Sequence, residues 1–244
     1  RHSDKTHKKL ELKVLENADH VVTVSPNCAK DLSKAPGKKV EVIYNGFDPE
    51  DFEGIPDLPE KLFSIAHFGA FNRDRNPAAL WKVLGNLAEE NRTFKEKLRI
   101  HLIGQTDDSV IQDIEKNGLK ENLVQTEHLP HKKGLQELAK SQVLLLPIND
   151  APNARGILPG KMYEYMALKR PILAIGPTDS DFVKILDDTK AGEAFDFNNA
   201  AGIKKALENY FRLFLEEKLT VESSAYEKFS RKNLAQKFID LSGK

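Results

Sequence analysis

Residues 143–146 read Val-Leu-Leu-Leu at the centre of the run Gln142–Ile148, and they show none of the polar alternation of a half-exposed strand. Unbroken apolar runs of this kind are typical of strands that are buried on both faces of a parallel sheet. Outward from this run, the chain alternates longer polar segments of helical period with five more β-rich runs, at Leu62–Gly69, Leu98–Gly104, Asn122–Thr126, Pro171–Gly176 and Ala191–Phe197. The sequence therefore predicts an α/β fold, a Rossmann-like parallel sheet flanked by helices.

The segments between these runs predict the helices that cover the sheet. Asn76-Pro77 marks the first start, because asparagine is a common N-cap and proline at the first helical position loses no hydrogen bond. We expect helices at Pro77–Glu90, Ser109–Asn117, Lys132–Lys140, Gly160–Leu168, Ser180–Asp187, Ala200–Glu217 and Ser224–Leu241.

The first 46 residues follow a different pattern, too short to close a core of their own. We expect a helix at Lys5–Asn17, a strand at His20–Ser25, a helix from Pro26 and a strand at Lys39–Tyr44. The turn-forming sequence Asn-Gly-Phe-Asp follows at residues 45–48, and the acidic, proline-bearing stretch 51–59 is typical of a linker. We therefore divide the chain into residues 1–46 and residues 47–244. The chain begins without methionine and in a helical pattern, so we expect a longer protein around it.

The composition excludes several classes of function. Lysine plus arginine and aspartate plus glutamate both number 37, so the chain lacks the positive bias that sequence-independent nucleic-acid binding needs. Cys28 is the only cysteine, which excludes an internal disulfide and a thiolate-rich zinc site, and we expect a buried structural thiol. No apolar run approaches the roughly 20 residues that span a bilayer, and the polar start lacks the apolar part of a signal peptide. We expect a globular, cytoplasmic protein.

Two loops at the carboxyl ends of the expected strands have the chemistry of an anion site. Gly69 is followed by Arg73 and Arg75 and then directly by a helix start, where free N–H groups and the helix dipole favour an anion. Gly160 opens a second helix, and Lys161 in its first turn adds another cation. Arginines and a lysine in contact with water remain the alternative.

Glu164 lies one turn after Gly160, so its carboxylate can sit on the same helix face and accept hydrogen bonds from ribose hydroxyls. An ordinary amphipathic helix with a surface glutamate explains the isolated pattern equally well.

Five stretches of the chain carry a resemblance when they are taken together. They are Ala-Asp-His-Val-Val-Thr-Val-Ser at 18–25, Val-Glu-Val-Ile-Tyr-Asn-Gly-Phe-Asp at 40–48, Leu-Pro-His at 129–131, Leu-Leu-Leu-Pro at 144–147 and Pro-Gly-Lys-Met-Tyr-Glu-Tyr-Met-Ala at 159–167. In this order they resemble the motifs of glycosyltransferase family 4, the retaining enzymes of the GT-B fold. The last stretch is similar to the family's E-x7-E region.

The resemblance implies a division of labour within a longer enzyme. Residues 1–46 would be the remnant of an acceptor-binding domain with its hinge, and residues 47–244 the nucleotide-sugar-binding domain. The enzyme would be a retaining hexosyltransferase that moves a sugar from a nucleoside-diphosphate sugar to a glycan or lipid-linked acceptor, with no metal, other cofactor or nucleic acid. Glu164 would hold the ribose. Peripheral association with the inner face of the membrane, through the missing half, stays open. We expect this chain alone to bind the donor without transferring the sugar.

The departures from the family pattern keep two alternatives open. Gly156 occupies the position of the first glutamate of E-x7-E, and Ala70 replaces the usual arginine after the first strand. Arg75 falls where the family has lysine, and Arg73 can compensate for the lost charge. The alternatives are a non-catalytic nucleotide-binding module and a sugar-nucleotide epimerase of the same fold.

Other side chains that could suggest chemistry are better explained by packing or loop roles. We expect His67, inside a strand, to be a satisfied core histidine. His128 and His131 are separated by a proline and lack nearby cysteines, so we expect a loop role and not a zinc site. Tyr163 and Tyr165 flank Glu164 and are expected in the core, where we also place Trp81.

Overall fold

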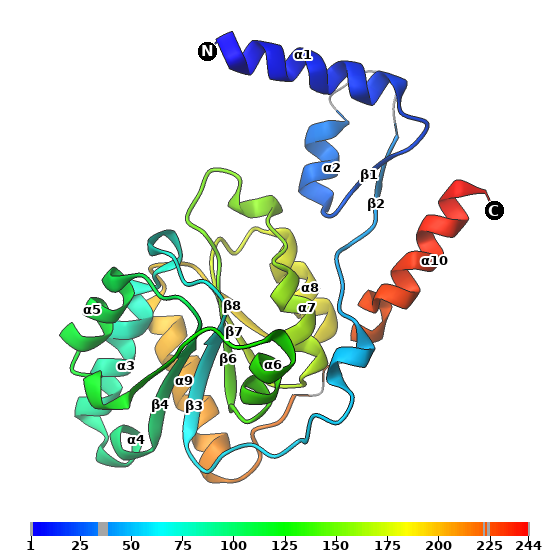
Figure 1. Cartoon of the computed structure of the whole chain (residues 1–244). Helices are drawn as coiled ribbons and strands as arrows, with labels where there is room; N and C mark the ends of the chain where they lie inside the picture. The colour runs from blue at the N-terminus through cyan, green and yellow to red at the C-terminus, as the bar shows by residue number, and fades with distance from the viewer. Residues whose placement is uncertain (1, 34–38, 222, 224, 244) are drawn as a thin grey trace.

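The computed structural model describes residues 2–33, 39–221, 223 and 225–243 (Figure 1). At its centre lies a six-stranded sheet in the order β5-β4-β3-β6-β7-β8. All the pairings between these strands are parallel. The strands are β3 (Phe63–Phe68), β4 (Leu98–Ile103), β5 (Leu123–Thr126), β6 (Val143–Pro147), β7 (Ile172–Ile175) and β8 (Gly192–Phe195). The predicted parallel sheet is confirmed.

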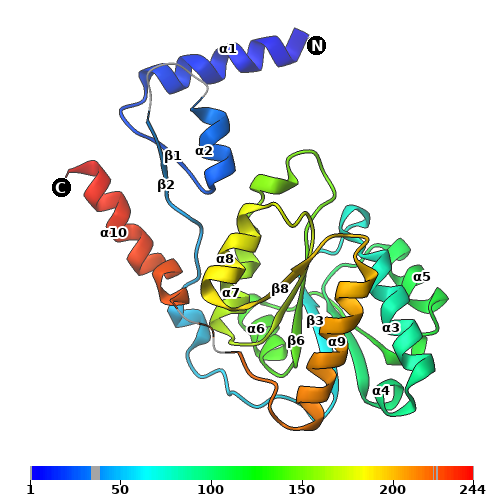
Figure 2. The same ribbon diagram turned by 180° about the vertical axis from the view of Figure 1, so that it is seen from behind.

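Helices cover both faces of this sheet (Figures 1 and 2). Neighbouring residues of β6 divide between two cores: Val143 and Leu145 belong to one, and Leu144 and Leu146 to the other. Burial on both faces therefore explains why the run has no polar alternation. One face carries α3 (Ala78–Glu90), α4 (Arg92–Lys97), α5 (Asp108–Lys116) and α9 (Ala200–Leu215), and the other carries α6 (His131–Ala139), α7 (Gly160–Ala167) and α8 (Asp181–Thr189).

The start of α3 differs from the prediction. The N-cap is Pro77, and the side chain of Asn76 makes no capping hydrogen bond. Its amide instead accepts a hydrogen bond from Trp81 Nε1 at 2.7 Å and donates one to Asp113 Oδ2 at 2.7 Å. The predicted cap at Asn76 is wrong, because this side chain joins α3 to α5. Trp81 itself is fully buried, as expected.

Two further helices differ from the prediction. The six-residue α4 has no predicted counterpart, because a helix of under two turns gives no readable periodicity. The predicted helix 224–241 is divided into a 3-10 turn, η5 (Tyr226–Phe229), and α10 (Arg231–Ser242), and its predicted first residue lies outside the described residues.

In the described part of the chain, no helix is both long and apolar enough to cross a membrane.

The beginning of the chain builds a small separate unit from α1 (His2–Asn17), β1 (Val21–Thr23), α2 (Pro26–Leu32) and β2 (Val40–Val42). The two strands pair only with each other, in parallel. Their core is small: Leu15 and Val21 are its buried residues. In Figures 1 and 2 this unit stands apart from the large sheet. The expectation that residues 1–46 add no strand to the large sheet is met for the described residues, and the domain boundary itself stays a prediction.

The hinge sequence at residues 45–48 is fixed by the C-terminal segment. Phe47 N donates to Phe229 O at 3.1 Å, and Arg231 N donates to Phe47 O at 2.8 Å. A Cβ on Gly46 would lie 2.0 Å from Phe229 O, so only glycine permits this approach of the two backbones. The ring of Phe229 also packs edge-on against Tyr44, with centroids 5.5 Å apart. The C-terminal segment is therefore fastened to the hinge before α10 begins.

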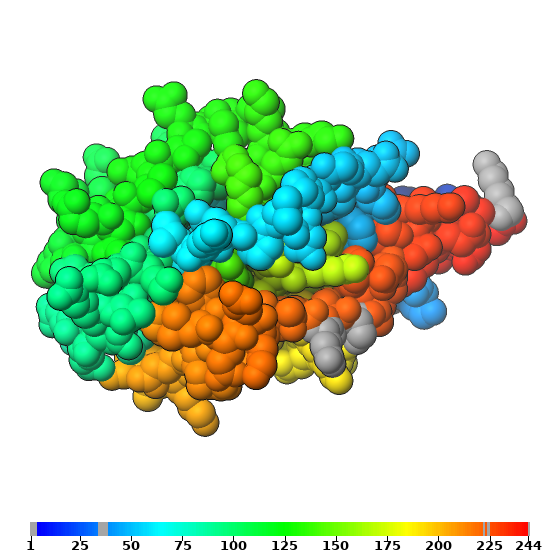
Figure 3. Space-filling view, turned by 90° about the horizontal axis from the view of Figure 1, so that it is seen from below, coloured from blue at the N-terminus to red at the C-terminus, as the bar shows by residue number. Residues whose placement is uncertain are grey.

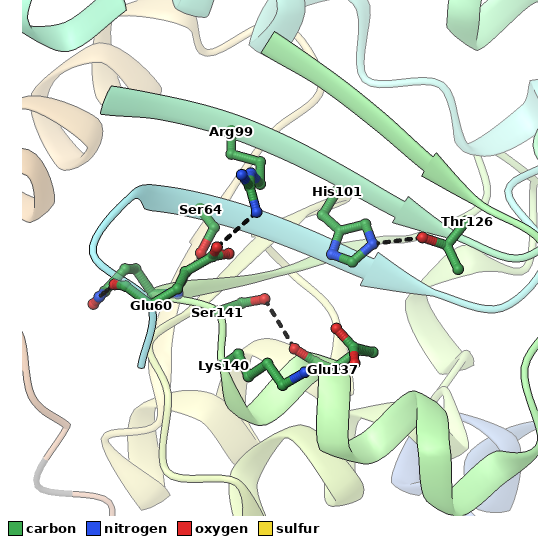
Figure 4. A network of polar contacts seen from close by, with 9 residues as sticks. Glu60, Ser64, Arg99, His101, Thr126, Glu137, Lys140 and Ser141 are labelled. Atoms are coloured by element: carbon green, nitrogen blue, oxygen red, sulfur yellow. Dashed lines mark hydrogen bonds and ion pairs between the residues drawn. The ribbon is translucent and has the colours of Figure 1, made fainter. Parts of the chain in front are cut away.

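The stretch that follows the hinge crosses the lower face of the molecule, as the light blue and cyan residues of Figure 3 show. A short 3-10 turn, η1 (Pro49–Phe52), begins it within the predicted linker. Further along, Glu60 N donates to Lys140 O at 2.8 Å, and the Glu60 carboxylate accepts a hydrogen bond from Arg99 Nη1 at 2.7 Å (Figure 4). These contacts fix the chain where it enters β3.

We predict that Gly46→Ala destabilises the protein by about 1–3 kcal/mol, the usual cost of forcing extra atoms into a packed site. The added methyl group must displace the backbone at Phe229 and loosen η5 and α10. Urea unfolding measures the free energy, and limited proteolysis reports on the C-terminal helix. Gly160→Ala is the matched control, since nothing lies within 4 Å of its Cβ position. Equal stability of the two variants would contradict this role of Gly46.

Candidate functional site

The order of the strands creates an opening between β3 and β6. These neighbours lie side by side, but the chain goes from β3 to β4 on one side and from β6 to β7 on the other. Loops that leave in opposite directions cannot cover the carboxyl ends of the two strands, and ligands of open α/β sheets bind at this point. Arg75, after β3, donates from Nε to Asn149 Oδ1, after β6. The candidate site is built around this opening.

Glycines bring the backbones of neighbouring loops together beside Arg75. Gly69 directly follows β3 with φ of +105°, a conformation that favours glycine. A Cβ on Gly104, after β4, would lie 3.0 Å from Gly69 O. A Cβ on Gly69 itself would lie 3.1 Å from Lys161 Nζ. The lack of side chains at these two positions therefore leaves the end of β3 open to a second cation.

Lys161 comes from α7 and reaches the end of β3. Its Nζ donates to Phe68 O at 2.9 Å. Burial, and after it the neighbouring charge of Arg75, lower the pKa of Lys161 to about 8, and Glu164 opposes the shift. Gly160, the first residue of α7, is exposed and has open space at its Cβ position. The structure thus brings Gly69, Arg75 and Lys161 together, and a positive charge is held there in spite of its cost.

Glu164 lies on α7 one turn beyond Gly160 and already has a partner. Its Oε1 accepts a hydrogen bond from Nε2 of His131 at 2.9 Å. The other ring nitrogen of His131 lies 3.8 Å from Asp51 Oδ2. Glu164 is therefore no isolated surface glutamate: its side chain is 22% exposed and oriented by His131. Sequence reasoning missed His131, although the histidine of the Leu-Pro-His stretch was a signal for it.

Arg73 is placed differently from Arg75. It is exposed and lines a cavity of about 360 Å³ together with Asp150, Phe197 and Asn198. Both arginines belong to the 3-10 turn η2 (Arg73–Arg75), but Arg73 is exposed whereas Arg75 is partly buried. Its predicted role as a phosphate ligand stays a prediction.

The tyrosines on either side of Glu164 are core residues, as expected, because both are fully buried. Tyr165 OH accepts a hydrogen bond from Phe68 N at 3.1 Å and so holds the end of β3. His67 is also buried, but its ring reaches Lys161, a neighbour that the sequence did not indicate. Over the described residues, no group of three or more His, Cys, Asp and Glu side chains could hold a metal ion.

Gly156, at the position of the first glutamate of E-x7-E, faces α2 of the small unit. A Cβ there would lie 3.2 Å from Cys28 Sγ and 3.5 Å from Ser25 Oγ. Cys28 is partly exposed beside it, so the predicted burial of this thiol is wrong. Nearby, Asn27 donates to both carboxylate oxygens of Asp181, from N at 2.8 Å and from Nδ2 at 2.9 Å. The two parts of the chain are therefore in direct contact at the edge of the candidate site.

We predict that Asp181→Ala frees α2 from the large domain. The variant removes both carboxylate acceptors of Asn27 and leaves only the longer contact of Nδ2 with Arg155 O at 3.4 Å. Hydrogen bonds to a charged group contribute about 1.5–3 kcal/mol, so amide exchange in α2 should accelerate about tenfold or more. Hydrogen exchange with mass spectrometry measures this. Asp187→Ala, an exposed carboxylate of the same helix, is the control. Unchanged exchange in α2 would show that other contacts hold the two parts together.

The fold agrees with those of known proteins over nearly the whole chain. TarM from S. aureus superimposes with a TM-score of 0.71 and 14% identity, covering 97% of this chain and 46% of that one. Sucrose-phosphate synthase from Thermosynechococcus elongatus gives 0.74 and 17%, with coverage of 98% and 61%. HepE from Anabaena, in complex with UDP, gives 0.68 and 16%, with coverage of 94% and 65%. This chain has the GT-B glycosyltransferase fold. It spans less than two thirds of each of these structures.

The sequence comparison points to the same group of proteins. Residues 1–51 match the model of Glycosyltransferase Family 4. No curated protein matches the chain. The match ends inside η1, just after the hinge, so it covers the small unit and the start of the crossing segment. The predicted fold class and the resemblance to GT-B glycosyltransferases are confirmed.

Proposed function

We propose that this chain is the donor-binding part of a glycosyltransferase that uses a nucleoside-diphosphate sugar. The observation that carries the proposal is the meeting of Arg75 and Lys161 at the opening between β3 and β6. Two cations from different elements, one of them partly buried, suit a ligand with two adjacent negative charges. TarM and HepE were both determined with UDP, which supports a diphosphate as this ligand.

The donor diphosphate would lie between the two glycine turns. The backbone N–H of Gly160, at the start of α7, would face it, and Arg75 and Lys161 would supply the positive charge. The N–H of Gly69 is not available, because it donates to Ile103 O at 2.8 Å. When the bond between the anomeric carbon and the diphosphate oxygen breaks, its electron pair stays on that oxygen. The acceptor hydroxyl forms the new bond to the anomeric carbon, and its proton passes to the departing diphosphate. Fixed positive groups stabilise the charge that develops on this oxygen in the transition state more than they stabilise the intact bound donor. This difference accelerates the reaction.

Glu164 would bind the ribose of the donor. The contact with His131 uses one side of the carboxylate, and an ionised carboxylate has room for further donors on its remaining lone pairs. A rotamer fixed by His131 lowers the entropy lost when the ribose hydroxyls bind. His131 is therefore part of the proposed ribose site, with Asp51 behind it.

The alternatives, a non-catalytic nucleotide-binding module and an epimerase-like GT-B protein, are not favoured. The family model and the structures with the same fold, which include a galactosyltransferase named WaaB, are glycosyltransferases. We further propose retention at the anomeric carbon, transfer of a hexosyl group to a glycan or lipid-linked acceptor, a cytoplasmic location and no requirement for a metal. Arg75 and Lys161 would supply the charge for which other transferases use a divalent cation. Contact with the membrane would belong to parts outside this chain.

Comparing uridine with UDP separates the two proposed subsites. We predict that Arg75→Ala weakens UDP binding at least about tenfold and uridine binding little, because a charge-assisted hydrogen bond contributes about 1.5–3 kcal/mol. Glu164→Gln should weaken both ligands alike by about 1–2 kcal/mol, because both carry the ribose. Isothermal titration calorimetry gives the affinities. Arg92→Ala, which removes an exposed arginine of α4, is the control and should leave both unchanged. Equal loss of uridine and UDP in Arg75→Ala would refute the phosphate role.

The lowered pKa of Lys161 predicts how UDP binding depends on pH. Lys161 is charged below about pH 8 in the free protein, so the affinity for UDP should fall as the pH rises through 8. Between pH 7 and 9 we expect the affinity to fall about tenfold, because most of Lys161 loses its charge in this range. The ligand does not contribute to this change, because the last ionisation of a terminal phosphate, near pKa 6, lies below it. Lys161→Arg should make the profile flat, because arginine stays charged. A flat profile in the parent protein would show that Lys161 does not contact the diphosphate.

A further inference from the structure

The ammonium group of Lys161 lies beside a buried histidine, His67. Its Nζ lies 3.3 Å from Nε2 of His67, in addition to its hydrogen bond of 2.9 Å to Phe68 O. His67 is fully buried inside β3. Both acceptors thus come from the last two residues of one strand, while the ammonium comes from the first turn of α7.

The surroundings of His67 determine which ring nitrogen can accept. Nδ1 lies 3.0 Å from Leu145 O in the neighbouring β6, and a carbonyl can only accept, so this contact favours a hydrogen on Nδ1. The carbonyl of Ala70 also faces the ring, but Lys161 Nζ, which can only donate, lies 3.3 Å from Nε2 and favours the same tautomer. In a neutral ring, Nε2 then has a free lone pair that faces the ammonium. Burial first, and the charge of Lys161 second, lower the pKa of His67 to about 3, against the carbonyls of Leu145 and Ala70 and with a smaller contribution from Arg75. The ring is therefore neutral throughout the physiological range.

We propose that His67 is a positioning residue, which holds the Lys161 ammonium at the end of β3 and aims its remaining N–H at the donor diphosphate. An ammonium has three N–H groups, and those directed at Phe68 O and His67 Nε2 leave one. Gly69 keeps the space beside it free of a side chain. A lysine chain with four rotatable bonds would otherwise lose much entropy on binding, and fixing it in advance avoids this loss. The diphosphate in this assignment rests on the proposed function, whereas the contact between the two side chains does not.

The alternative is that His67 only fills the core. Its ring does pack 4.6 Å from that of Phe71, centroid to centroid. A core role, however, requires neither one particular tautomer nor any influence on Lys161. These two properties distinguish a positioning residue from a packing residue.

The first test uses the unmutated, ligand-free protein. Long-range 1H–15N correlation spectra of the histidine rings report the tautomer, with His67→Gln identifying the signal. We expect a His67 signal with the hydrogen on Nδ1 that does not titrate between pH 5 and 9. A hydrogen on Nε2, directed at the Ala70 carbonyl, or a charged ring at neutral pH would overturn the proposal, because neither form can accept from Lys161.

The second test measures Lys161 itself, through the carbon next to the ammonium in 13C-labelled lysine, with Lys161→Arg assigning the signal. His67→Phe keeps a ring in the core but removes the acceptor, so the pKa of Lys161 should fall below its value in the parent protein. His67→Gln retains an acceptor and should restore part of the shift. Arg75 and Glu164, whose charges shift the pKa of Lys161, are unchanged in both variants. If the pKa of Lys161 were the same in the parent and in folded His67→Phe, His67 would be a core residue only.

UDP affinity then links the pair to the donor. At pH 8, His67→Phe should bind UDP about tenfold more weakly than the parent protein. At pH 6.5 this difference should be smaller, because more of Lys161 is charged in the variant. His67→Gln should lie between it and the parent protein. If the parent bound no UDP while the tautomer and the pKa behaved as expected, the positioning of Lys161 would stand and the assignment of the diphosphate would fail.

Discussion

The fold partly buries the cation of Lys161, and the arrangement of the sheet explains how the charge is kept there. An ammonium loses much of its hydration when it is buried, and the loss must be offset by acceptors of fixed geometry. Here the acceptors belong to the end of β3: the Phe68 carbonyl and the neutral ring of His67. They are available because β6, next to β3, directs its loop away and leaves this edge open. The position of the Lys161 charge therefore depends on the order of the strands in the sheet.

The same opening is served by residues that keep the backbones close. Gly69 and Gly104 allow two loops to touch, and Tyr165, from the core side of α7, accepts the N–H of Phe68. Interiors are packed too tightly to shift by small amounts, so the end of β3 is held rigidly against α7. A rigid site suits binding of a charged group, because little rearrangement is needed when the ligand arrives.

The small unit at the start of the chain depends on the large domain. With few buried residues of its own, it is held at two places: the hinge, where Gly46 approaches Phe229, and the edge of the site, where Asn27 contacts Asp181. The second contact lies beside Gly156. The first side-chain atom of a glutamate at that position would already lie in tight contact with Cys28 Sγ, so the departure from the E-x7-E pattern fits the closeness of α2.

The sequence by itself determined the large sheet and the approximate place of the site. Strands buried on both faces must be apolar at successive positions, and β6 reveals this in four residues, Val143–Leu146. Glycine turns and cations at strand ends are equally local signals, and they indicated the candidate residues Gly69, Arg75 and Lys161, which the structure brings together. Only the tertiary structure decided which side chains meet. Asn76 bonds Trp81 and Asp113 instead of capping α3, Glu164 bonds His131, and His67 faces Lys161 from 94 residues away. Apart from the contact of Asn76 with Trp81, these contacts join positions 33 or more residues apart. Their partners are set by the packing of helices on the sheet, which no local pattern of residues records.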